Sequence, residues 1–175
     1  MKLPLKALRR GFTLLEMTVV MLVGMALAAI MLSMLNQQIA FLKIFRAQSF
    51  LNEEVPMISN HVSKLLSDAE RFRMHASLQD ALAGSNPKLT SSPVLVLNFR
   101  QPDGSVRAGI LSFETRSGKK ALYYYVVPTS GVLTQPEWVV TSKAANVEFY
   151  MVSGMIATRV TGPAGEEVFF TGAME

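Results

Sequence analysis

The stretch Gly11-Phe12-Thr13-Leu14-Leu15-Glu16 opens a long apolar segment, and it decides how the rest of the chain is organised. Residues 17–35 contain no charged side chain, so Glu16 is the only charge between Arg10 and Lys43. A lone carboxylate in a membrane-spanning helix costs at least ~2.5 kcal/mol on insertion scales. Because no neighbour in sequence neutralises Glu16, its position indicates a function that involves a partner.

The apolar segment predicts a single transmembrane helix. Residues 12–35 make 24 positions, about 36 Å of helix, which is enough to cross a hydrocarbon core of ~30 Å with some tilt. A short leader precedes it, with no acidic residue and four basic ones: Lys2, Lys6, Arg9 and Arg10. An excess of Lys and Arg before the helix predicts an N-terminus in the cytoplasm of a single-pass inner-membrane protein, with the C-terminal domain in the periplasm.

The formal net charge of +4 arises from the leader. Four of the 17 basic residues lie there, and the remaining 13 equal the 13 acidic residues. The high isoelectric point is therefore no argument for a nucleic-acid partner. The chain has no cysteine, which excludes disulfides, thiolate metal sites and a cysteine nucleophile.

A cleaved secretory signal peptide is the main alternative for this segment. Ala26-Leu27-Ala28 offers a small-x-small cleavage site that would leave Ala29 as the first mature residue. Two features count against it: Glu16 would weaken the hydrophobic region, and the apolar run continues through residues 30–35. A plain signal anchor remains open, but it gives no reason for Glu16.

The hexapeptide resembles the N-terminal processing motif of type IV pilins and of the related pseudopilins of type II secretion systems. The resemblance implies that a prepilin peptidase cuts after Gly11 and methylates the new N-terminal Phe12, with Glu16 as the fifth mature residue. Its implied partners are other pilin or pseudopilin subunits, the inner-membrane assembly platform and membrane lipid. All elements of the motif are present, and the resemblance covers roughly the first 40 residues.

Elementary electrostatics agrees with this resemblance. Cleavage would leave a charged amine on Phe12, one helical turn from Glu16 on the same face. In a filament, the Glu16 carboxylate of one subunit would pair with the Phe12 amine of its neighbour, and a wrong axial register would leave both charges unpaired. The hypothesis is that Glu16 sets subunit register.

Two patterns within the apolar run bear on helix contacts. Met17, Met21 and Met25 form a stripe, and Gly24 with Ala28 makes a small-xxx-small pair. They fit a helix–helix contact face in a filament core. They fit a generic lipid-facing anchor equally well.

A second, amphipathic helical segment is predicted over residues 36–83. Its apolar residues recur at spacings of three and four, among them Ile58, Val62, Leu65, Leu66 and Phe72. Pro56 removes a backbone donor, so we expect a kink or short break near 52–56. Gly84-Ser85-Asn86-Pro87 would end the helix.

Residues 93–175 read as an antiparallel sheet. Expected strands, separated by turn residues, are 94–100, 106–115, 120–127, 138–140, 146–153, 155–162 and 167–171. A long N-terminal helix packed on an antiparallel sheet is an α+β fold, which is also what the pilin resemblance implies. The sheet region resembles minor pseudopilins of the J type, on the basis of the strand around Trp138, Val147-Glu148-Phe149-Tyr150, and a hairpin that ends in 161–167.

The globular part offers little catalytic chemistry. His61 and His75 are expected on the same helix but 14 residues apart, too far to share a metal, and Asp103 is interpreted as a turn residue rather than a calcium ligand. No cofactor is predicted. Five basic residues at hairpin ends and on neighbouring strands fit a solvated surface better than a phosphate-binding rim, because the mature charge is near zero: Arg100, Arg107, Arg116, Lys119 and Lys120.

These observations predict a pilin-like structural subunit, not an enzyme. A minor subunit of a type II secretion pseudopilus or a type IV pilus is favoured, because major pilins commonly carry a C-terminal disulfide loop and this chain has no cysteine. The alternative is a periplasmic binding domain on a simple signal anchor, or one released by signal peptidase. The mature N-terminus distinguishes the two.

Overall fold

The computed structural model describes residues 12–128, 133 and 135–171. By its contacts the chain divides into two units, residues 1–43 and residues 44–175.

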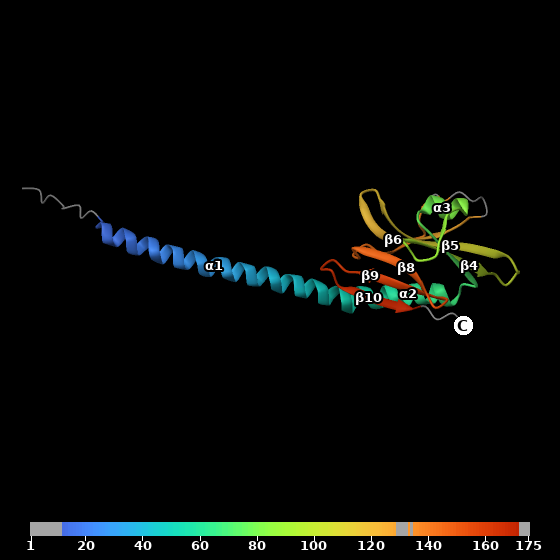
Figure 1. Cartoon of the computed structure of the whole chain (residues 1–175), viewed down its shortest axis with the longest axis horizontal. Coiled ribbons are helices and arrows are strands. Elements are labelled where there is room, and N and C mark those ends of the chain that lie inside the picture. Colours follow the sequence, from blue (N-terminus) through green and yellow to red (C-terminus); the bar gives the residue numbers. More distant parts are fainter. Residues whose placement is uncertain (1–11, 129–132, 134, 172–175) are drawn as a thin grey trace, which may run out of the picture. The chain divides into compact units, whose positions relative to one another are not determined.

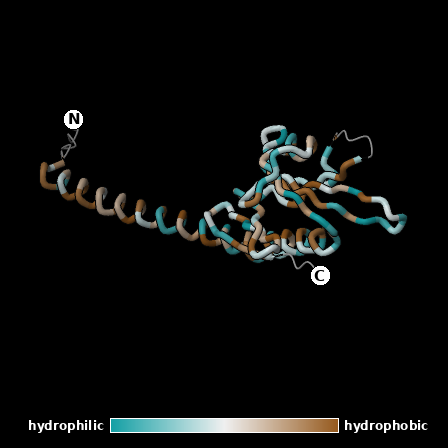
Figure 2. The backbone as a smooth tube through the Cα atoms, turned by 45° about the vertical axis from the view of Figure 1, so that its right-hand side comes forward, coloured by the Kyte–Doolittle hydropathy of each residue, from teal (hydrophilic) through white to brown (hydrophobic). Residues whose placement is uncertain are grey.

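The described part of the first unit belongs to one helix. Helix α1 (Leu14–Ser49) is 36 residues long, has no buried residue, and continues into the second unit. Brown and tan colours predominate along its first half in Figure 2, and teal appears farther along. The helix lacks an apolar stripe because apolar residues surround it, which is typical of a helix made for lipid or for other helices.

The described residues of the second unit combine helices with ten strands. Figure 1 shows their arrangement. The helical elements after α1 are the π-helical turn η1 (Phe50–Glu54), α2 (Val55–Ser67) and α3 (Leu78–Ala83). The strands are β1 (Arg71–His75), β2 (Pro87–Lys88), β3 (Ser91–Ser92), β4 (Val94–Arg100), β5 (Val106–Arg116), β6 (Lys119–Val126), β7 (Trp138–Thr141), β8 (Asn146–Val152), β9 (Met155–Thr161) and β10 (Glu167–Thr171). The α+β class predicted from sequence is confirmed.

The strands form two antiparallel sheets rather than one. The larger has the order β2-β1-β4-β5-β6-β7, and the smaller β10-β9-β8-β3. Two-residue turns, Ser117-Gly118 and Ser153-Gly154, join β5 to β6 and β8 to β9, and all four residues have positive φ. Turns of that geometry match the twist of the flanking strands, so these hairpins are locally encoded.

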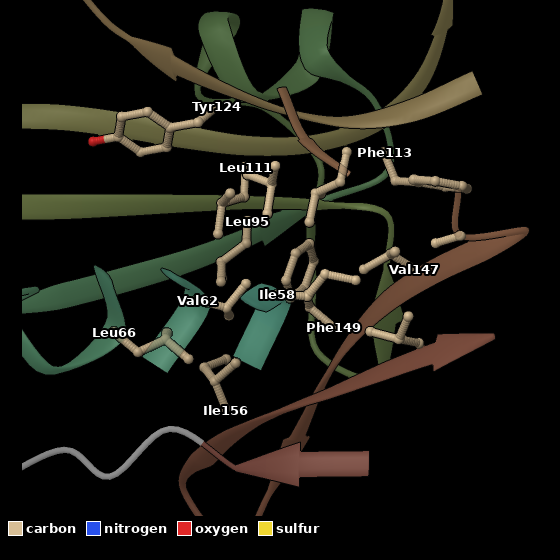
Figure 3. Close-up of a cluster of buried hydrophobic side chains, with 14 of the residues drawn as sticks. Ile58, Val62, Leu66, Leu95, Leu111, Phe113, Tyr124, Val147, Phe149 and Ile156 are labelled. Carbon is tan, nitrogen blue, oxygen red and sulfur yellow. The ribbon is translucent and has the colours of Figure 1, made fainter. Parts of the chain in front are cut away.

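The main core lies between α2 and both sheets. Ile58, Val62 and Leu66 are each at most 1% exposed and repeat at every fourth position, so they form one buried face of α2. Figure 3 shows these side chains among Leu95 and Leu111 of the larger sheet and Ile156 of the smaller. The opposite face of the larger sheet carries a second cluster, on which α3 lies; its buried members are Val94, Val96, Ile110, Ala121, Tyr123 and Tyr125.

The helix predicted to reach residue 83 ends at Ser67, which corrects the expectation from sequence. Residues 71–75 are strand β1, paired with β4 over its whole length, so sheet formation begins before residue 93. His75 is therefore on a strand, 2% exposed, and its Nδ1 lies 2.7 Å from the carbonyl oxygen of Ser85. Residues 71–75 continue a helix-like spacing of apolar residues, but their hydrogen bonding to the central strand β4 decides their conformation.

The irregularity expected near Pro56 is a π-helical turn rather than a break. Val55 N–H donates to the carbonyl oxygen of Phe50, five residues back, and α2 continues with Pro56 in its first turn. Pro56 has no N–H to give to the carbonyl four residues before it, so the chain widens one turn where a normal helical bond is missing. The wider turn places Phe50 and Glu54 inside the protein, at 3% and 8% exposure.

Candidate assembly site at the start of the long helix

Helix α1 begins with a reciprocal cap between Thr13 and Glu16. Thr13 N–H donates to Oε2 of Glu16 at 2.8 Å, and Thr13 Oγ1 donates to the same oxygen at 3.0 Å. Glu16 N–H donates to Thr13 Oγ1 at 3.3 Å. This arrangement satisfies two backbone donors that the first turn of any helix leaves unpaired.

Thr13 joins the candidate site through these contacts, although it is absent from the residues predicted above. Its signal was present in the chain, since Thr-x-x-Glu directly before an apolar run is a capping box. The cap fixes the side chain of Glu16 against the backbone of its own chain. Glu16 therefore has a defined orientation before any partner arrives.

The cap uses one carboxylate oxygen of Glu16. Oε2 carries both bonds from Thr13, whereas Oε1 has no hydrogen-bond partner among the residues that the structure describes. The surrounding side chains are exposed and apolar: Phe12 at 79%, Leu14 at 84% and Leu15 at 72%. The site is thus an exposed acceptor on an apolar surface, at a helix N-terminus.

The next turns of α1 are equally open. Met17, Met21 and Met25 are 52%, 62% and 68% exposed, and a Cβ added at Gly24 would meet no atom within 4 Å. Within the described residues, one continuous helical stretch, Leu14–Ser67, is long and apolar enough to cross a membrane. The exposed positions leave both interpretations of the methionine stripe open, a helix contact face and a lipid-facing anchor.

Most residues of the predicted cleavage point and topology signal fall outside the described residues. This applies to Gly11 and to the leader residues Lys2, Lys6, Arg9 and Arg10. Phe12, the residue on the other side of the cleavage bond, directly precedes the cap. The roles of these residues stay predictions.

The remaining sequence candidates do not form a joint site. Exposed His61 has its Nδ1 2.8 Å from the carbonyl oxygen of Met57, whereas His75 is buried on β1. Asp103 Oδ1 accepts two bonds from Ser105, at 2.9 and 2.6 Å, as in an ordinary Asx turn. These two bonds lower the pKa of Asp103. Residues 12–171, where described, contain no cluster of three His, Asp or Glu side chains suited to a metal.

The five basic residues weighed as a phosphate rim are distributed over two ends of the larger sheet. Arg107 lies near the start of β5 and Arg116 at its end, nine residues apart, which is about 30 Å in an extended strand. Arg100 is bound to Glu70 at 2.7 Å, and Lys120 lies 4.9 Å from the centre of the Phe113 ring. The structure therefore does not bring these residues together in one patch.

Comparison with known proteins finds a family match, and it includes the start of the long helix. Residues 6–35 match the family described as the prokaryotic N-terminal methylation motif. No curated protein and no solved structure gives a significant match to the chain. The match ends at residue 35, so the resemblance of the sheet region to J-type minor pseudopilins is not supported. Residues 6–35 thus carry an N-terminal methylation motif of the prepilin type, and the helix that begins within it is long and apolar enough to cross a membrane.

Proposed function

We propose that this protein is a minor structural subunit of a type II secretion pseudopilus or a type IV pilus. Prepilin peptidase cuts the Gly11–Phe12 bond and methylates Phe12. Before assembly the chain spans the inner membrane, with its N-terminus in the cytoplasm and residues 44–175 in the periplasm. The methylation motif at residues 6–35 supports this proposal.

The observation that carries the proposal is that only one of the two carboxylate oxygens of Glu16 is hydrogen-bonded by the described residues of its own chain. Oε2 is bound by Thr13 and Oε1 is left for an external donor. A carboxylate in an apolar environment is stable only when it is paired and hydrogen-bonded. The amine that cleavage creates on Phe12 of a neighbouring subunit supplies a donor of the right charge, at a fixed axial offset.

The proposal makes Glu16 a register device. Subunits slide easily along an apolar helix surface, because apolar contacts have no direction. A single charge pair removes that freedom, since every other offset leaves two charges unpaired in an apolar environment. Thr13 assists by holding Glu16 in place.

Mass determination of the mature N-terminus tests the proposal. Expression together with a prepilin peptidase is expected to yield a chain that starts at N-methylated Phe12. Gly11→Leu is the matched variant, because it alters the cleavage motif and leaves the apolar segment intact. A mature chain that starts at Ala29 would instead support a periplasmic binding domain released by signal peptidase, and an uncut chain would support a simple anchor.

A further inference from the structure

The two edges of the larger sheet differ sharply. β2 at one edge consists of Pro87 and Lys88, the residue types that discourage pairing with a further strand. β7 at the other edge reads Trp-Val-Val-Thr, without proline or charge, and no strand in the described residues pairs with its outer side. Trp138 and Val139 are 40% and 51% exposed. Among the described residues, β7 is therefore an edge strand without a covering strand, and it exposes apolar side chains.

A groove of about 610 Å³ runs beside this edge, between β7 and α2. Its lining residues are Met57, His61, Lys64, Leu65, Asp68, Trp138, Val139 and Val140. Along α2, the wall from Met57 to Asp68 spans 11 residue steps, about 16 Å at 1.5 Å per residue. A wall of that length matches about five residues of an extended chain, which is close to the length of β7.

The position of the Trp138 ring is set by a buried aromatic neighbour. The ring stacks on Tyr124, with ring centres 4.3 Å apart, and Tyr124 is only 5% exposed. Trp138 also lines a second hollow of about 470 Å³, together with Leu65, Phe99 and Val126. The Trp138 ring therefore provides apolar surface to both the groove and this second hollow. Its position is set by Tyr124 in the core beneath it.

We propose that β7 and this groove bind an extended segment of another polypeptide as an added strand. Its backbone would pair with the outer side of β7, and its alternate apolar side chains would contact Trp138 and the Met57–Leu65 wall. An extended chain is the favoured occupant because the unpaired feature is a strand edge, whose row of backbone N–H and C=O groups matches that of another strand.

The partner is a different protein rather than a second copy of this chain. Two β7 edges would pair about a two-fold axis and close on each other, whereas subunits of a filament repeat in one direction. This choice of partner rests on the proposed function, but the presence of a strand-binding edge does not.

The experiment uses the full chain in lipid nanodiscs and a capped Val-Thr-Val-Thr-Val peptide as the probe. Trp138 is the only tryptophan of the chain, so its fluorescence reports occupancy of the groove directly. The peptide is expected to change that fluorescence saturably and to slow amide exchange in β7 at least tenfold. The same peptide methylated at every backbone nitrogen, which cannot pair, should do neither.

Val139→Lys and Val152→Lys form a matched pair of variants, since the two valines are 51% and 50% exposed. Val139→Lys should weaken peptide binding at least tenfold, and Val152→Lys on β8 should leave it unchanged, with unaltered far-UV circular dichroism in both. Equal binding of the methylated peptide, or equal behaviour of the variants, would overturn the proposal. Slower amide exchange in β7 that depends on protein concentration alone would also overturn it, because it indicates that a second copy covers the edge. A change in Trp138 fluorescence with the sugar cellohexaose but not with the peptide would overturn it too, because it indicates a carbohydrate site. Because the mature N-terminus is measured separately, failure here leaves the proposed function standing.

Discussion

Oε1 of Glu54 lies 2.6 Å from Nζ of Lys143, and Oε2 of Glu54 accepts a hydrogen bond of 3.1 Å from Thr141. Glu54 ends the π-helical turn and is 8% exposed, whereas Lys143 follows β7 and is largely exposed. The hydrogen bond to Glu54, together with the charge of Glu54, raises the pKa of Lys143. This ion pair ties the helical segment to the connection between the two sheets.

The Glu54–Lys143 pair predicts an asymmetry between its two partners. Lys143→Met should lower the free energy of unfolding by about 1–3 kcal/mol, because it leaves a buried carboxylate with Thr141 alone. Glu54→Gln should cost less, since the amide still accepts from Thr141 and Lys143 stays in water. Urea denaturation followed by Trp138 fluorescence measures both changes. The double variant should be more stable than Lys143→Met alone, and simple additivity would contradict the pairing.

Gly162 is predicted to be intolerant of any side chain. A Cβ there would lie 2.6 Å from Cδ1 of Phe50, which is 3% exposed, and 2.5 Å from Oε2 of Glu166. Gly162→Ala should therefore destabilise the protein by about 1–3 kcal/mol through overpacking. Phe50→Leu makes room at the same place, so the double variant should lose less stability than the sum of the two single variants. Thermal unfolding of the four proteins measures the coupling, and a coupling of zero would refute the contact.

Substitutions at Glu16 and Thr13 should distinguish the proposed assembly role of Glu16 from its role in the helix cap. Glu16→Leu is expected to insert in the membrane normally but to fail to enter filaments, because it removes the acceptor for the neighbour's amine. Thr13→Val removes only the two hydrogen bonds of the cap that use Thr13 Oγ1, at a cost of about 1 kcal/mol to the helix start, and should reduce rather than abolish assembly. Filament fractions compared with membrane fractions measure both effects. Normal assembly of Glu16→Leu would remove Glu16 from the proposed mechanism.

Acid should weaken the smaller sheet. Hydrogen bonds from Tyr150 and Arg159 lower the pKa of Glu148 below its ordinary value of 4.5. A carboxylate with a lowered pKa in the folded state contributes stability that is fully present above its unfolded value and is lost as pH falls through the folded value. Unfolding free energy should therefore decline below about pH 4.5. In Glu148→Gln it should be lower at neutral pH and depend less on pH in the acid range, as urea titrations between pH 3 and 7 would show.

Local signals in the sequence determined much of this protein. The hexapeptide at residues 11–16 and the apolar run after it predict the long helix and the methylation motif that the comparisons find. Strand β10 has its predicted bounds, and β4 does as well, because alternation and turn residues act over a few positions. The Thr13–Glu16 cap was equally local and was readable as a capping box.

Only the tertiary structure decided how these elements combine. Residues 71–75 were predicted to continue the helix, and pairing with β4 makes them a strand. Glu54 meets Thr141 across 87 positions, and β7 becomes one edge of the larger sheet, with β2 at the other. Such outcomes depend on which distant segments pair and bury each other, and a periodicity within one segment carries no information about its partners.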